Sequence, residues 1–138
     1  MKFAFAIVCL ICTAGLAGCS SGTVNTDVRA NPTAHPQVIQ DMRIITDPGL
    51  NSVCQIVGVY KTTVSSDLLK IQVDVYNSQT EPAQFNYKFE WIDQDGIIVD
   101  TPLSIWKTQT IQGGEVISLT AVSPNPRATD FRLKLQAA

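Results

Sequence analysis

An alternation of apolar and polar residues with a period of two runs through most of this chain and is the strongest constraint on its fold. It is clearest between Phe85 and Trp91, where every second residue is aromatic, and it recurs at Leu69 to Val75 and at Phe131 to Leu135. Side chains of a strand point alternately to its two faces, so this period predicts strands with one buried and one solvated face. No segment has an apolar period of 3.6 over a helical length.

Turn residues divide the alternating region into seven or eight short strands. We expect these at 43–46, 53–64, 69–75, 85–91, 97–99, 104–110, 116–121 and 131–135. Gly58, inside the second of them, predicts a β-bulge or a close backbone approach. Many short strands with frequent turns are typical of an all-β fold, and we predict an antiparallel, immunoglobulin-like β-sandwich over residues 37–138. A region of this length is long enough for one hydrophobic core and too short for two, so we expect one domain.

The first residues follow a different pattern. After Met1 and Lys2, the chain is apolar from Phe3 to Leu16; as a helix this run is about 21 Å long, against roughly 30 Å for a hydrocarbon core. Leu16-Ala17-Gly18-Cys19 then has the apolar, small, small, Cys pattern at which lipoprotein precursors are processed. We therefore expect a signal peptide at residues 1–18 and a mature chain that begins with a lipid-bearing Cys19.

Lipid on Cys19 predicts where the protein works. A diacylglycerol on the thiol and a further acyl chain, such as palmitate, on the freed amino group hold a protein on a membrane essentially permanently. Ser20 stands where an Asp would favour retention in the inner membrane, so we expect the inner leaflet of the outer membrane, facing the periplasm. Residues 19–36 then form a polar tether, with a reach of about 20 to 25 Å.

Composition argues against several classes of function. Without Lys2 the chain keeps nine basic residues against twelve acidic ones, with no long basic run, which argues against nucleic acid as a partner. The one histidine, His35, lies in the expected tether, so the domain lacks the histidine of a Ser-His-Asp or Cys-His site. Cys54 lies in an apolar run without a basic neighbour, which predicts a buried thiol. We expect no enzyme and no cofactor.

Two acidic residues and two tryptophans need individual interpretations. Asp93 and Asp95 lack the further ligands of a calcium loop, so they predict a hairpin turn and no metal site. Trp91 continues the aromatic alternation and is expected in the core. The strand around Trp106 has few apolar partners to fix its inward face; burial is the favoured interpretation, and an interaction site is the alternative.

Arg127 lies in an unusual loop, Asn125-Pro126-Arg127-Ala128-Thr129. Its guanidinium is expected either to bond loop carbonyls, which is the favoured interpretation, or to contact a partner. Arg and Trp dominate the binding energy of protein interfaces. Trp106 and Arg127 are therefore the candidate interaction residues.

Three segments carry a resemblance to a known family. They are 89–96 (FEWIDQDG), Trp106 and 123–133 (SPNPRATDFRL), and with Cys19 they resemble the YcfL-like family of small periplasmic lipoproteins. The resemblance covers most of the domain and implies a β-sandwich on a lipid anchor, with no established catalytic residues. In some bacteria, genes of this family lie near that of a lipoprotein that activates a peptidoglycan synthase, which hints at cell-wall work.

These observations predict a non-catalytic interaction module of the cell envelope, linked to peptidoglycan or outer-membrane maintenance. Its exposed loops or an edge strand would bind an unknown envelope protein. The first alternative is binding of a small glycan, peptide or lipid, which needs a concave pocket of several hundred Å³ with a few convergent polar groups. A second alternative is the lipoprotein component of a secretion apparatus. Fold alone does not choose among them.

Overall fold

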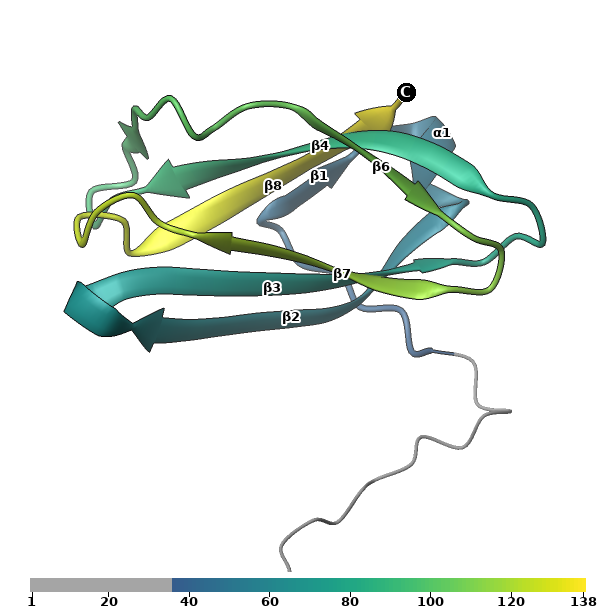
Figure 1. Ribbon diagram of the computed structural model, residues 1–138, viewed down its shortest axis with the longest axis horizontal. Helices are drawn as coiled ribbons and strands as arrows, with labels where there is room; N and C mark the ends of the chain where they lie inside the picture. The colour runs from purple at the N-terminus through teal and green to yellow at the C-terminus, as the bar shows by residue number, and fades with distance from the viewer. Residues whose placement is uncertain (1–35) are drawn as a thin grey trace, which may run out of the picture. The chain divides into compact units, whose positions relative to one another are not determined.

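Two β-sheets face each other in the part of the chain that the computed structural model describes, residues 36–138 (Figure 1). The elements in chain order are β1 (Ile44–Thr46), α1 (Pro48–Asn51), β2 (Cys54–Val64), the 3-10 turn η1 (Ser65–Asp67), β3 (Leu68–Asn77), β4 (Ala83–Ile92), β5 (Ile98–Val99), β6 (Lys107–Ile111), β7 (Val116–Val122) and β8 (Asp130–Ala137). The predicted all-β sandwich is confirmed.

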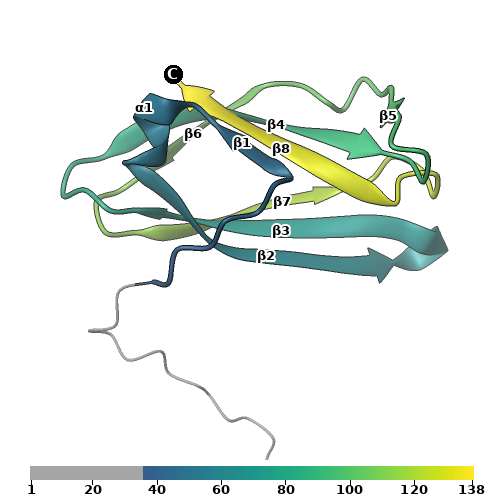
Figure 2. The ribbon, with the colours of Figure 1, turned by 180° about the vertical axis from the view of Figure 1, so that it is seen from behind.

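The larger sheet has the strand order β1-β8-β4-β5, and β6 also pairs with β4. β4 is therefore flanked along one side by β8 and along the other by β5 and β6. The smaller sheet has the order β2-β3-β7. Figures 1 and 2 show it as a separate layer beneath the larger one. All pairs are antiparallel except β1 with β8, a parallel pair that the sequence analysis did not anticipate.

The core lies between the inward faces of the two sheets. β3 contributes Ile71, Val73 and Val75, and all three are fully buried. Opposite them, Phe89 and Trp91 of β4 are 7 % and 2 % exposed, which confirms the prediction for Trp91. Burial of such side chains contributes about 25 cal/mol per Å² of apolar surface removed from water. The period-two pattern thus places one row of each strand in a common core.

One local prediction was wrong in detail, and one was right. The chain after β1 also forms the short helix α1, which the strand pattern did not predict and which the Asp47 carboxylate caps by accepting the Gly49 N–H at 2.8 Å. The strand expected from Ser104 begins only at Lys107, because residues 101–104 form a turn in which the Ser104 N–H donates to the Thr101 carbonyl. The bulge at Gly58 is confirmed by a register shift between Ile56 and Gly58.

Asn77 joins the layers at the end of β3. It is fully buried, and its Nδ2 donates to the carbonyls of Glu81 at 2.8 Å and Ile111 at 3.4 Å. Its Oδ1 accepts the Gln79 N–H at 3.0 Å, and its carbonyl accepts the Gly114 N–H at 3.0 Å. A buried amide with all its groups bonded stabilises a defined geometry. Here it holds the β3–β4 and β6–β7 connections together.

The same corner gives a stability prediction. A Cβ on Gly113 would lie 2.0 Å from the Thr80 carbonyl oxygen, so Gly113→Ala is expected to lower the free energy of unfolding by about 3 kcal/mol. Gly96 is the control: its φ is +81° but it has open space around it, so Gly96→Ala costs only about 1 kcal/mol from backbone strain. Urea denaturation measures both, and equal losses would contradict the close approach.

Candidate functional site

Trp106 lies at the surface of the larger sheet. It is 43 % exposed, and the Lys88 ammonium sits 5.3 Å from the centroid of its indole ring. The favoured interpretation of a buried Trp106 was therefore wrong. The register that pairs Tyr87 with Lys107 places Trp106 opposite Lys88, and both side chains fall on the outer face.

Arg127 lies elsewhere, in the loop before β8. Its backbone N–H donates to the Asn125 side chain at 3.0 Å, while its guanidinium is 78 % exposed and 3.9 Å from the Asp93 carboxylate. Arg127 therefore presents its charge to solvent. The Asp93 carboxylate accepts the N–H groups of Asp95 and Ile97, which confirms the predicted hairpin turn.

Exposed apolar side chains recur between the residue before β5 and the residue before β6. Five large ones, each between 43 and 64 % exposed, fall within residues 97–106: Ile97, Ile98, Leu103, Ile105 and Trp106. Leu103 and Ile105 line one cavity, whereas Trp106 lies on the outer face beside Lys88. We call residues 97–106 the apolar segment.

The apolar segment forms one lip of a cavity of about 400 Å³, which we call the aromatic cleft. The β4 side chains Tyr87, Phe89 and Trp91 line it together with Leu103 and Ile105 from the apolar segment. The Phe89 and Trp91 rings are stacked with centroids 6.3 Å apart. Thr120–Val122 of β7 form the other lip, on the side where β6 and β7 diverge into different layers (Figure 1). The cleft is thus an opening between the sheets.

β7 is an edge strand beside this cleft. It pairs with β3 alone among the described strands, so the N–H and C=O groups on its other side have no strand partner there. Edge strands usually carry charges or proline that prevent pairing with another chain. β7, with the sequence VISLTAV, carries neither, whereas β2 at the opposite edge has the exposed Lys61. β7 is an unprotected edge.

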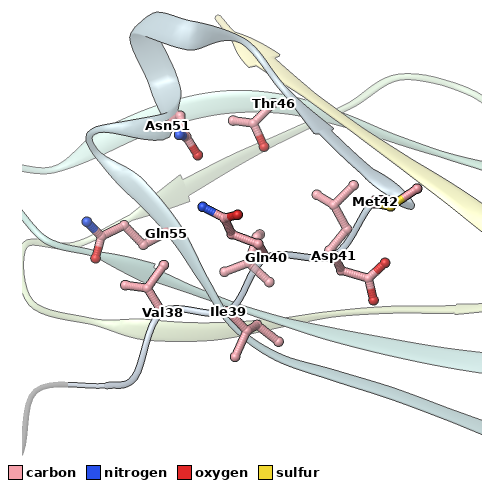
Figure 3. Close-up of a pocket in the computed structure, with 10 residues that line it drawn as sticks. Val38, Ile39, Gln40, Asp41, Met42, Thr46, Asn51 and Gln55 are labelled. Atoms are coloured by element: carbon pink, nitrogen blue, oxygen red, sulfur yellow. The ribbon is translucent and has the colours of Figure 1, made fainter.

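A second, more polar cavity of about 600 Å³ opens between β1 and β2. Residues 38–42 cross its mouth, and the Ile39 N–H bonds the Ile56 carbonyl at 2.8 Å. Figure 3 shows Gln40, Thr46 and Asn51 approaching the opening from three different segments. We call it the open-edge cavity. Its size and convergent polar groups meet the requirement of the small-ligand alternative.

The outer face of the larger sheet carries a buried carboxylate among three cations. Glu90 is 6 % exposed; its Oε1 lies 2.8 Å from Lys134 Nζ and 2.9 Å from Lys88 Nζ, and its Oε2 lies 3.6 Å from Arg132. Burial opposes ionisation of the Glu90 carboxyl, but the hydrogen bonds from Lys134 and Lys88 prevail and hold its pKa below the usual value. We call these four residues the Glu90 cluster.

The remaining predicted features concern chemistry and the anchor. Cys54 is fully buried as predicted, and burial raises the pKa of its thiol to about 11. Within residues 36–138, no three His, Cys, Asp or Glu side chains gather in a way that would hold a metal ion. That region also has no helix long and apolar enough to cross a membrane. Cys19 and residues 1–18 lie outside the described residues.

Fold and site together define a two-sheet β-sandwich with an unprotected edge strand beside an aromatic cleft. Residues 44–137 match the family described as protein of unknown function DUF1425, and the chain belongs to this family. The resemblance to YcfL-like proteins is thereby confirmed at the level of the family.

Two solved structures are similar to the chain. One is a crystal structure of Campylobacter jejuni cj0090, with 25 % identity and a TM-score of 0.62 over 71 % of this chain and 100 % of that one. The other is a DUF1425 family member from Shewanella sp. pv-4, with 24 % identity and a TM-score of 0.58 over 62 % and 78 % of the two chains. Among proteins with curated functions, none matches.

The Glu90 cluster predicts a pH dependence of stability. The pKa of Glu90 is lowered in the folded state, so its contribution is fully present above the unfolded pKa of about 4.5 and is lost as the pH falls through the lower folded value. Urea denaturation between pH 7 and pH 3 should therefore show a smaller acid loss of stability in Glu90→Gln than in the wild type. Identical slopes for the two proteins would contradict the assignment.

Proposed function

We propose that this protein is a non-catalytic interaction module of the bacterial cell envelope, anchored by lipid on Cys19, and that it binds an extended segment of a partner envelope protein at the β7 edge. The pattern Leu16-Ala17-Gly18-Cys19 supports the anchor, and the polar residues 20–36 support a tether. The observation that carries the binding proposal is the unprotected β7 edge beside the aromatic cleft.

Addition of a partner strand would use both parts of this site, the unpaired β7 edge and the aromatic cleft. A partner strand laid along β7 would bond its free backbone groups and become a fourth strand of the smaller sheet. Alternate side chains of that strand would enter the aromatic cleft and contact Tyr87, Phe89 and Trp91. Backbone bonds would then supply affinity, and the cleft would supply specificity.

The apolar segment adds a hydrophobic contribution. Leu103 and Ile105 are 63 % and 57 % exposed on the lip of the cleft. Covering them would stabilise the complex by about 25 cal/mol per Å² of apolar surface removed from water. A partner strand paired with β7 would lie along one lip and would face Leu103 and Ile105 on the other.

The open-edge cavity favours a second candidate function, the binding of a small envelope ligand. Gln40, Thr46 and Asn51 would provide its polar contacts, and Ile44 and Ile56 an apolar wall. This site lies between β1 and β2, whereas the aromatic cleft lies between β4 and β7. One experiment therefore separates the two candidates.

Site-specific photocrosslinking in intact cells tests the proposal. We expect a photoreactive residue at Ile105 to give one abundant protein adduct, because position 105 borders the bound strand. Mass spectrometry should locate the crosslink in an extended segment of the partner. With the photoreactive residue kept at position 105, Leu103→Asp should reduce partner capture at least tenfold, since a carboxylate on this lip would lose its water. Cys19→Ser should also reduce capture, because the tether would no longer raise the local concentration.

Tyr60 and Asn51 provide the control positions. Tyr60 is 56 % exposed on β2, at the opposite edge of the smaller sheet, so it matches Ile105 in exposure but not in location. Equal adducts at positions 105 and 60, or none at 105, would refute binding at the β7 edge. A small-molecule adduct at Asn51 without a protein adduct at 105 would favour the second candidate.

A further inference from the structure

We propose that the outer face of the larger sheet binds an acidic saccharide, with Lys88, Arg132 and Lys134 contacting its carboxylates and Trp106 packing against its ring. This inference is independent of the β7 edge. It rests on the arrangement of the Glu90 cluster beside an exposed indole.

The strand register brings these side chains into adjacent positions. Lys88 of β4 pairs with Lys134 of β8, and Glu90 pairs with Arg132 one step along the same face. On the other side of β4, continuation of the β6 register places Trp106 next to Lys88. Lys134, Lys88 and the Trp106 indole therefore lie in one row across three neighbouring strand positions, and Arg132 lies beside Glu90 in the next row.

The Glu90 cluster has more positive than negative charges. Among residues 36–138, the ion pairs of Lys88, Arg132 and Lys134 all go to Glu90, so three cations share one carboxylate. The side chains of Lys88, Arg132 and Lys134 are 21, 38 and 33 % exposed, so part of each remains accessible to a ligand. This occurs in a chain whose net charge is −2. The face is a local positive patch on an acidic protein.

The arrangement combines the stabilising contacts of Glu90 with a structural cost. Lys88 and Lys134 are like charges directly opposite each other, which destabilises a sheet. Burying a carboxylate to hold them costs further free energy, and ion pairs of this kind often stabilise a fold less than apolar residues would. Glu90 does, however, fix three flexible cations in one geometry, and such preorganisation lowers the entropic cost of binding an anion.

Two features favour a saccharide over a peptide as the ligand: the pairing of the strands that carry the cations, and the exposed indole of Trp106. Lys88 lies on β4, and Arg132 and Lys134 lie on β8. Both strands are paired on their two sides, so the three cations flank no free strand edge for a peptide backbone among the described strands. A sugar acid presents an apolar C–H face and a carboxylate in one rigid ring. The indole of Trp106 and the Lys88 ammonium beside it match those two groups.

Calorimetric titration of the mature protein in neutral detergent tests the proposal. The probe is tetragalacturonic acid, and maltotetraose is its neutral counterpart. We expect the acidic tetrasaccharide to bind at least tenfold more tightly, with an affinity that falls as salt rises. Trp106→Ala and Lys134→Gln should each weaken binding about tenfold.

Lys70→Gln is the matched control, because Lys70 is an exposed lysine of β3 in the other sheet. It should leave the affinity unchanged. Equal binding of the two tetrasaccharides, no binding of the acidic one at millimolar concentration, or equal losses in Lys70→Gln and Lys134→Gln would overturn the proposal. So would binding of phosphatidylglycerol vesicles, but not the saccharide, with the same dependence on Lys134 and Trp106.

Discussion

The core, the aromatic cleft and the Glu90 cluster all depend on the side chains of β4, which alternate between its two faces. β4 pairs with β8, β5 and β6, more partners than any other described strand has. Its inward row, which includes Phe89 and Trp91, packs in the core and also forms the floor of the aromatic cleft. Its outward row carries Lys88 and Glu90. A period of two in one central strand thus determines core, cleft and charged face together.

The parts of the fold that depend on local pattern were predictable from the sequence. The alternation around Phe89 located β4, the apolar surroundings of Cys54 predicted its burial, and a glycine within a strand predicted the bulge at Gly58. These properties depend on strand period and on backbone freedom, which act over a few residues.

The sites were not predictable, because they depend on contacts between distant segments. The Glu90 cluster exists because β4 pairs with β8, 44 residues further along the chain. The aromatic cleft exists because β6 and β7 diverge into different layers, which no local pattern encodes. Burial was the favoured interpretation for Trp106, but the pairing of β6 with β4 leaves it beside Lys88 at the surface.

The two proposed surfaces suit a tethered protein. The proposed lipid anchor would confine the domain near the membrane. The local concentration of envelope ligands would then be high, so modest affinities for a partner segment and for an acidic saccharide would suffice. The β7 edge and the outer face of the larger sheet belong to different sheets, so one ligand would not displace the other. Such a module would join two envelope components without catalysing a reaction.

Amide hydrogen exchange across β7 tests strand addition most directly. In the purified protein, the amides of Val116–Val122 on the free edge should exchange rapidly, because no strand covers them. Addition of the crosslink-identified partner segment, as a synthetic peptide, should slow these amides at least tenfold and leave the central strand β3 unchanged. Unchanged exchange in β7 on addition of a peptide that binds would contradict binding at this edge.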